Sequence, residues 1–304
     1  MLTTSSRARA GATLLAVAAL FTAALVAQSE FQWNNPLPAN APEGVVHATF
    51  HSKANKTTVG YNILLPPGYN AADNANRRYP VIYYLHGGRP GGEQKSVGLA
   101  QVMGDAMRAG DVQPMIYVFV NGGKLSHYDH EGSLGETAFV QELIPHVDKT
   151  YRTIAERNGR GVEGFSQGGR GTARYLFKHR DLFVSAAPMG GGHQYERLID
   201  QNDGAESDTL RITPPWNNTW ELARRYAADR NGLPVNILVV VGTKDQNYQP
   251  NLDWMAHLTN LGIPFEKIIV PDTPHSAKEV YAKRGLDCMR FHAANFERAL
   301  GKSW

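Results

Sequence analysis

A serine flanked by glycines lies between a strand-like and a helix-like segment near the middle of the chain. Residues 161–165 are the strand-like segment, 170–179 are helix-like, and the run between them contains Gly164-x-Ser166-x-Gly168. A serine on so tight a turn needs neighbours without Cβ atoms, because its backbone is strained and its Oγ must project into solvent. The pattern predicts a strand-turn-helix elbow with Ser166 at its tip. Five positions with three fixed residues also arise by chance, so the rest of the chain has to supply the partners of a reactive serine.

Strand-like and helix-like segments alternate along most of the 304 residues. Apolar residues make up 42% of the chain and charged ones 19%, which supports a sizeable buried core. An antiparallel strand pair is expected at 45–52 and 57–65. Further strands are expected at 79–85, 115–120, 161–165, 183–189, 235–241 and 265–270, and helices at 98–109, 137–151, 173–179, 252–261 and 276–300. This alternation predicts an α/β fold, a mostly parallel central sheet with helices on both faces, in one domain without repeats.

The first residues have the pattern of an export signal. Arg7 and Arg9 precede an unbroken run of small and apolar residues at 11–26, and a polar segment follows. We expect a signal peptide at 1–27, a proline-containing connector at 28–44 and a catalytic domain at 45–304, with the mature protein secreted to an extracellular or periplasmic compartment. A retained membrane anchor is the alternative, although the apolar run is shorter than the ~20 residues that span a bilayer.

Two other polar residues follow predicted strands as Ser166 does. Asp245 comes after the strand at 235–241, and His275 comes after the strand at 265–270. Ligands of parallel sheets bind at the carboxyl ends of the strands, where three such loops meet. A hydroxyl, a carboxylate and an imidazole in the chain order Ser, Asp, His match the order used on a nucleophile elbow. We predict a triad of Ser166, Asp245 and His275.

The chemistry assigns a role to each member. A serine hydroxyl needs a base to take its proton, and His275 is our choice, with Asp245 fixing its tautomer. Asp245 could instead be an ordinary capping carboxylate, and Asp272 is the rival for the acid. Among the other histidines, His86 is tied to a glycine turn and His292 lies within the last helix, so roles behind the site or on the surface suit both better.

An oxyanion formed by attack on a carbonyl requires hydrogen-bond donors. The backbone N–H of Gln167, directly after the nucleophile, is the first candidate. The second is the N–H of Gly88 in the His86-Gly87-Gly88 run after the strand at 79–85, where glycines let the backbone approach a substrate. These glycines could also simply make a turn.

Other features carry weaker signals. Residues 127–131, His-Tyr-Asp-His-Glu, could suggest metal ligands, but a polar loop would look the same and the spacing fits no familiar site. Cys288, the single cysteine, lies in a helix-like segment with the spacing of a core residue. We expect no metal and no cofactor. The net charge of +3, which loss of a leader would lower by two, gives no support to nucleic-acid binding.

A long segment at 193–234 separates two predicted strands. It carries Trp216 and Trp220, which could form an aromatic wall over Ser166 for a sugar or phenolic ring, with Tyr248 nearby in the later sequence. Ordinary packing of a surface insertion is the alternative interpretation.

Three runs together resemble a known family. They are Tyr-Pro-Val-Ile-Tyr-Tyr-Leu-His-Gly-Gly at 79–88, Glu-Leu-Ile-Pro-His-Val-Asp-Lys-Thr-Tyr-Arg-Thr at 142–153, and Gly-Phe-Ser-Gln-Gly-Gly at 164–169. The chain is similar in these runs to the "Putative esterase" family of the α/β-hydrolase superfamily, which includes feruloyl esterases, acetyl xylan esterases, esterase D-like enzymes and mycolyltransferases. One departure is Ser276-Ala277-Lys278 after His275, where many members have a bulky aromatic residue.

The resemblance implies a serine esterase with an α/β-hydrolase fold. The expected substrate is a small-molecule or polysaccharide-linked ester, foremost a feruloyl or acetyl ester of plant polysaccharide, cleaved through an acyl-enzyme. Acyl transfer to a sugar hydroxyl, as in mycolyltransferases, and carbohydrate binding without turnover are the alternatives. Neither nucleic acid nor, once the leader is removed, a membrane is expected as a stable partner.

Overall fold

A computed structural model describes residues 31–88, 90–125, 127–197, 216–229 and 231–302. The predicted leader at 1–27 therefore lies outside the described residues. In the described part, no helix is both long and apolar enough to cross a membrane. The described part of the predicted connector is hydrogen-bonded to the domain. The Gly60 N–H donates to the Trp33 carbonyl at 2.7 Å, and the Asn35 N–H donates to Glu93 Oε1 at 2.7 Å.

One large sheet organises the described residues, with the strand order β1-β2-β4-β3-β7-β8-β9-β10. Only β2 among these runs antiparallel to both of its neighbours, and β4, β3, β7, β8, β9 and β10 are mutually parallel. The bounds are β1 Val45–Ser52, β2 Thr57–Leu64, β3 Val81–Leu85, β4 Ile116–Val120, β7 Arg160–Phe165, β8 Ser185–Met189, β9 Asn236–Lys244 and β10 Glu266–Pro274. The mostly parallel sheet and the early antiparallel pair confirm the predicted α/β fold.

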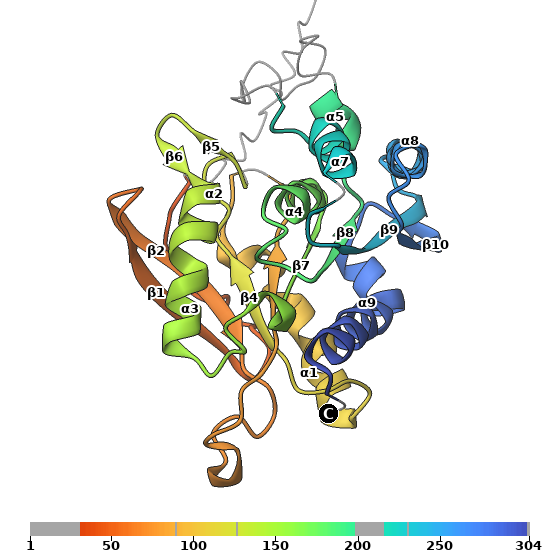
Figure 1. Cartoon of the computed structure of the whole chain (residues 1–304). Coiled ribbons are helices and arrows are strands. Elements are labelled where there is room, and N and C mark those ends of the chain that lie inside the picture. Colours follow the sequence, from red (N-terminus) through yellow and green to blue (C-terminus); the bar gives the residue numbers. More distant parts are fainter. Residues whose placement is uncertain (1–30, 89, 126, 198–215, 230, 303–304) are drawn as a thin grey trace, which may run out of the picture. The chain divides into compact units, whose positions relative to one another are not determined.

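Helices cover both faces of this sheet (Figure 1). One face packs against α3 (Ile144–Thr150), α4 (Gln167–Lys178), α7 (Thr219–Ala228) and α8 (Tyr248–Asn260), and the other against α1 (Ala100–Ala109) and α9 (Ala277–Leu300). The central strand β3 serves both layers, because Val81, Tyr83 and Leu85 join one core cluster and Ile82 and Tyr84 the other. Alternate side chains of a strand point to opposite faces, which is why its sequence is continuously apolar.

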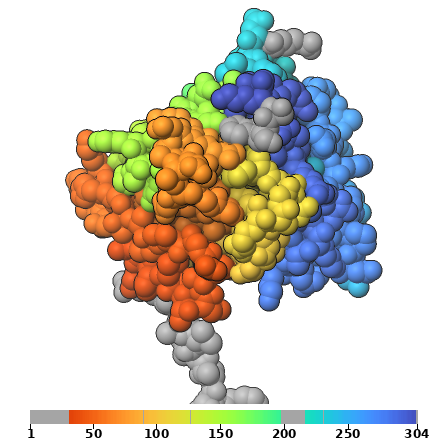
Figure 2. Space-filling model, turned by 90° about the horizontal axis from the view of Figure 1, so that it is seen from below, coloured from red at the N-terminus to blue at the C-terminus, as the bar shows by residue number. Residues whose placement is uncertain are grey.

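Shorter elements complete the described chain. They are η1 Ala72–Asn74, η2 Glu93–Leu99, β5 Asp129–His130, β6 Ser133–Leu134, α2 Gly135–Thr137, η3 Ala138–Leu143, η4 Arg157–Gly159 and α5 His193–Arg197. The helix expected at 98–109 is thus a 3₁₀ turn followed by α1, and the one expected at 137–151 is divided among α2, η3 and α3. Viewed from below, the yellow segment around α1 lies between the red-orange N-terminal part and the blue C-terminal part (Figure 2).

Two strands extend further than their sequence pattern predicts. The apolar run of β9 ends at Val241, yet the strand continues to Lys244 because β10 continues beside it, with Pro274 opposite Lys244. Gly242 makes the close pairing possible, since a Cβ there would lie 2.1 Å from the Thr273 carbonyl oxygen. The extension brings Asp245 and His275 directly to the ends of neighbouring strands.

Candidate active site

Ser166 occupies the strained turn that its sequence predicts. Its φ of 61° and ψ of −116° are unfavourable for a residue with a side chain, and α4 begins at the next residue. The turn fits against β3 because its neighbours are glycines: a Cβ on Gly164 would lie 2.5 Å from the Leu85 carbonyl oxygen, and one on Gly168 would lie 1.9 Å from it. The Ser166 N–H donates to the Met189 carbonyl at 2.8 Å, which ties the turn to β8 as well.

The imidazole of His275 lies between the serine and a carboxylate. Its Nε2 is 2.9 Å from Ser166 Oγ, and its Nδ1 is 2.8 and 2.9 Å from the two carboxylate oxygens of Asp245. Asp245 is only 5% exposed, and its Oδ1 also accepts the N–H of Asn247 at 2.7 Å. The structure therefore brings the three predicted residues into one chain of hydrogen bonds with the spacing of a nucleophile, a base and an orienting acid.

The rival residues lie elsewhere. Asp272 is exposed and forms an ion pair with Lys244 at 2.9 Å, and the hydrogen bond from that lysine lowers the pKa of its carboxyl. His292 is buried on α9, which covers the face of the sheet opposite to α4, and its Nδ1 lies 2.7 Å from Ser185 Oγ. Cys288 is buried and its pKa is raised by desolvation, as expected for a core cysteine and not for a nucleophile.

The glycine turn after β3 passes beside the nucleophile. A Cβ on Gly87 would lie 2.9 Å from Ser166 Cβ, so the backbone of this turn is in direct contact with the elbow. Gly88 has a φ of 73°, in the left-handed region that glycine adopts without strain. Gln167 is the first residue of α4, at the end of the helix where backbone N–H groups point outward along the axis. The two candidate oxyanion donors thus belong to the residue that follows Ser166 and to the turn whose Gly87 contacts Ser166.

The three aromatic residues considered as substrate contacts differ in exposure. Trp220 is only 8% exposed, and its indole N–H donates to the His193 carbonyl at 2.9 Å, so the ring anchors α7 and presents little surface to a ligand. Trp216 is half-buried, with the Arg225 guanidinium 4.4 Å from its ring. Tyr248 is half-buried at the start of α8. Most of the predicted insertion, residues 198–215, lies outside the described residues.

The polar run at 127–131 does not gather into a metal site. His127 is buried and directs its Nε2 to the His86 carbonyl at 2.8 Å, whereas the carboxylate of Asp129 accepts hydrogen bonds from Thr137. Within the described ranges, no group of three His, Cys, Asp or Glu residues could hold a metal ion. The proximity of His127 to the oxyanion turn was not predicted from the sequence, since the two are 41 positions apart.

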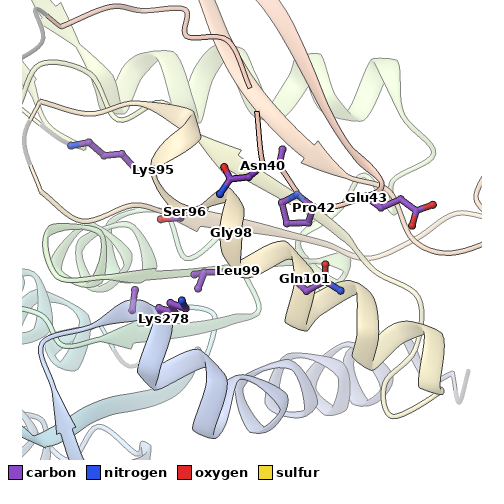
Figure 3. Close-up of a pocket in the computed structure, with 11 residues that line it drawn as sticks. Asn40, Pro42, Glu43, Lys95, Ser96, Gly98, Leu99, Gln101 and Lys278 are labelled. Carbon is purple, nitrogen blue, oxygen red and sulfur yellow. The ribbon is translucent and has the colours of Figure 1, made fainter. Parts of the chain in front are cut away.

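A cavity of about 640 Å³ lies beside η2 and the first residues of α1 and α9 (Figure 3). Its lining is mixed, with amide, hydroxyl, ammonium and backbone groups. The residues are Asn40, Ala41, Pro42, Glu43, Lys95, Ser96, Gly98, Leu99, Gln101, Ala277 and Lys278.

Comparison with known proteins identifies the family. The model of the family described as "Putative esterase" matches residues 52–261, and the chain belongs to this family of α/β-hydrolases. An esterase of Mycobacterium tuberculosis (strain ATCC 25618 / H37Rv) is 33% identical over 260 residues, which are 73% of this chain and 54% of that protein. The chain therefore spans about half the length of the curated relatives it matches.

Further similar proteins are named as feruloyl or ferulic acid esterases. An endo-1,4-beta-xylanase/feruloyl esterase of Xylanibacter ruminicola is 29% identical over 161 residues, 49% of this chain and 22% of that protein. Among solved structures, a ferulic acid esterase superposes with a TM-score of 0.70 at 25% identity, covering 83% of this chain and 98% of that one. A fluorophosphonate-binding serine hydrolase of Staphylococcus aureus has a TM-score of 0.67 at 19% identity, covers 81% of this chain and 97% of that one, and shows the shared fold. Family and neighbours together support a carboxylic ester hydrolase.

Proposed function

We propose that this chain is a serine carboxylester hydrolase in which Ser166 is the nucleophile, His275 the general base and Asp245 the orienting acid. The observation that carries the proposal is the continuous hydrogen-bonded chain from Ser166 Oγ through His275 to Asp245, at 2.9 and 2.8 Å. The strained backbone of Ser166 supports the same role, because such strain persists where function requires it.

In this proposal the proton follows the hydrogen bonds of the triad. The carboxylate of Asp245 can only accept, so the proton on His275 resides on Nδ1 and Nε2 is free to take the proton of Ser166 Oγ during attack on an ester carbonyl. The resulting imidazolium gives that proton to the departing alcohol oxygen, which leaves an acyl-enzyme on Ser166. Water then repeats the sequence and releases the carboxylic acid.

The tetrahedral intermediates of both steps carry a negative oxygen. We assign its stabilisation to the N–H groups of Gln167, at the start of α4, and of Gly88, in the turn after β3 whose Gly87 lies beside Ser166. The N-terminus of α4 adds the positive end of the helix dipole. Loss of one such donor typically costs ~3 kcal/mol of barrier.

We further propose that the substrate is a feruloyl or acetyl ester of a plant polysaccharide, and that the protein is exported to meet it. The names of the xylanase/feruloyl esterase relative and of the ferulic acid esterase neighbour support this class of substrate. The leader-like sequence at 1–27 supports export.

The test compares hydrolysis of p-nitrophenyl acetate by the wild type and by S166A. We expect S166A to lose activity by a factor of 10³ or more and to lose covalent labelling by a fluorophosphonate. Unchanged turnover in S166A would overturn the mechanism, and an unlabelled wild type that binds glycans would favour the non-catalytic alternative.

Substrate class is tested with the same preparation. Methyl ferulate and acetylated xylan are compared for kcat/KM, and trehalose is added to detect acyl transfer. Preference for either ester with water as acceptor is the expected result. Formation of an acylated sugar in place of the free acid would show that the chain is a transferase.

A further inference from the structure

The peptide that joins Gly87 to Gly88 is flanked on both sides by residues without side chains. The absence of Cβ atoms removes the clashes that normally fix the direction of a peptide plane, and Gly88 adopts its φ of 73° without the strain that a side chain would add. In the function proposed above, the Gly88 N–H has to face the substrate carbonyl. Some other group must therefore select the orientation of this peptide.

The side chain of His86 is placed to do so. Its Nδ1 lies 3.0 Å from the Gly87 carbonyl oxygen, and its Nε2 lies 3.2 Å from the backbone nitrogen of Gly122. A carbonyl oxygen can only accept and a backbone N–H can only donate, so these two partners fix the tautomer with the proton on Nδ1. The ring is 1% exposed and burial lowers the pKa of His86 to about 4, which keeps it neutral at ordinary pH.

Fixing the oxygen of this peptide also fixes its N–H. In a planar trans peptide the C=O and the N–H point in opposite directions, so the Gly87 oxygen held by His86 sets the direction of the Gly88 N–H. We propose that His86 is a positioning residue, whose Nδ1–H holds the Gly87–Gly88 peptide with its N–H in the oxyanion-binding orientation. This inference rests on the proposed esterase function and deepens it.

A second histidine holds the other side of His86. His127 Nε2 donates to the His86 carbonyl at 2.8 Å, and the two imidazole rings are 4.7 Å apart between centroids. The His127 carbonyl in turn accepts from the Tyr175 hydroxyl at 2.8 Å and from the Arg174 guanidinium. Both of these residues lie on α4, the helix that begins at Gln167. The two proposed oxyanion donors are thus positioned by the same helix, one directly and one through two histidines.

The test uses the different reach of asparagine and glutamine. In H86N the side-chain amide can occupy the place of Nδ1 and donate to Gly87, whereas in H86Q the amide reaches the place of Nε2 and the bond to Gly87 is lost. We expect H86Q to lower kcat for p-nitrophenyl acetate by about 10- to 100-fold with KM changed less than about threefold, because the donor acts on the transition state. H86N should recover most of that loss.

A transition-state analogue gives a second readout. A trifluoromethyl ketone forms a tetrahedral adduct whose oxygen lies in the oxyanion site, so H86Q should weaken its binding by the same factor as kcat. H292Q is the matched control, since it also removes a buried imidazole and its 2.7 Å hydrogen bond to Ser185 but lies on the other side of the sheet. It should lower the melting temperature and leave kcat and inhibitor binding near wild type.

The outcomes separate the two proposals. An inactive, unlabelled wild type would defeat the esterase function itself. An active wild type with equal kcat in H86Q and H86N would overturn the positioning role alone. If H86Q fails to fold, H127N and H127Q make the same comparison at the hydrogen bond from His127 Nε2 to the His86 carbonyl. Only H127Q keeps a donor at the Nε2 position. Equal kcat in these two variants would overturn the inference as well.

Discussion

Gly168 provides a quantitative test of how closely the elbow is packed. A Cβ at this position would lie 1.9 Å from the Leu85 carbonyl oxygen and 2.5 Å from its carbon, whereas Cβ atoms essentially never approach within 3.0 Å. In G168A, α4 and the end of β3 must therefore separate by roughly 1 Å, and neither is a flexible side chain that could turn aside. Overpacking of this kind costs about 3 kcal/mol.

The displacement should reduce catalysis as well as stability. Ser166 precedes Gly168 by two residues, and a misplacement of about 1 Å can cost roughly 10²-fold in rate. We expect G168A to lower kcat for p-nitrophenyl acetate by about that factor and to lower the free energy of unfolding in urea by about 3 kcal/mol. G98A is the matched control, because a Cβ on Gly98 would have no atom within 4 Å. A G168A enzyme within threefold of wild-type kcat and within about 0.5 kcal/mol in stability would refute the packing argument.

Three further changes test separate parts of the structure. Burial alone would raise the pKa of Glu136, but its contacts with His179 and Lys178 lower that pKa to about 2. The ionised carboxylate therefore stabilises the fold above the unfolded pKa of Glu136, and this contribution is lost as pH falls toward 2. The free energy of unfolding of the wild type in urea should exceed that of E136Q by about 1 kcal/mol less at about pH 3.5 than at pH 7, and a constant difference would contradict this. D245N should lower kcat by about 10³- to 10⁴-fold at nearly constant KM, because the amide no longer fixes the tautomer of the base; equal activity would exclude Asp245 as the acid. W220F should lower the free energy of unfolding by about 1 kcal/mol, because the indole hydrogen bond is lost, and should leave kcat/KM unchanged. A fall in kcat/KM without a loss of stability would instead place the ring in the substrate site.

The sequence predicted the fold and the meeting of three residues because both follow from local patterns. Continuous apolar runs mark strands buried on both faces, and the ends of parallel strands meet at one edge of the sheet. Ser166, Asp245 and His275 can therefore be placed together from the sequence alone. The Gly87-Gly88 turn can be placed beside them for the same reason.

The partners of the buried polar residues could not be predicted in this way. His127 contacts His86 from a loop 41 positions away, and Arg174 pairs with Glu196 across 22 positions. No periodicity marks such pairs, because they are set by how helices and loops pack in three dimensions. Trp220 was predicted to contact substrate for the same reason. An aromatic residue in a polar segment has the same local sequence whether its ring is exposed or buried, and the Trp220 ring is only 8% exposed.

The buried ion pair between Arg174 and Glu196 suggests that α4 positions several parts of the site. Arg174 and Glu196 have fully buried side chains 2.7 Å apart, and burying two charges costs about as much as their attraction returns. Stability alone therefore gives little reason for the pair. Its geometry gives a better one: Arg174 holds the His127 carbonyl, and Glu196 Oε2 accepts the N–H of Thr219 at the start of α7. Through these bonds the pair connects three parts of the site: the loop of His127, the helix α4 that follows the nucleophile, and the start of α7.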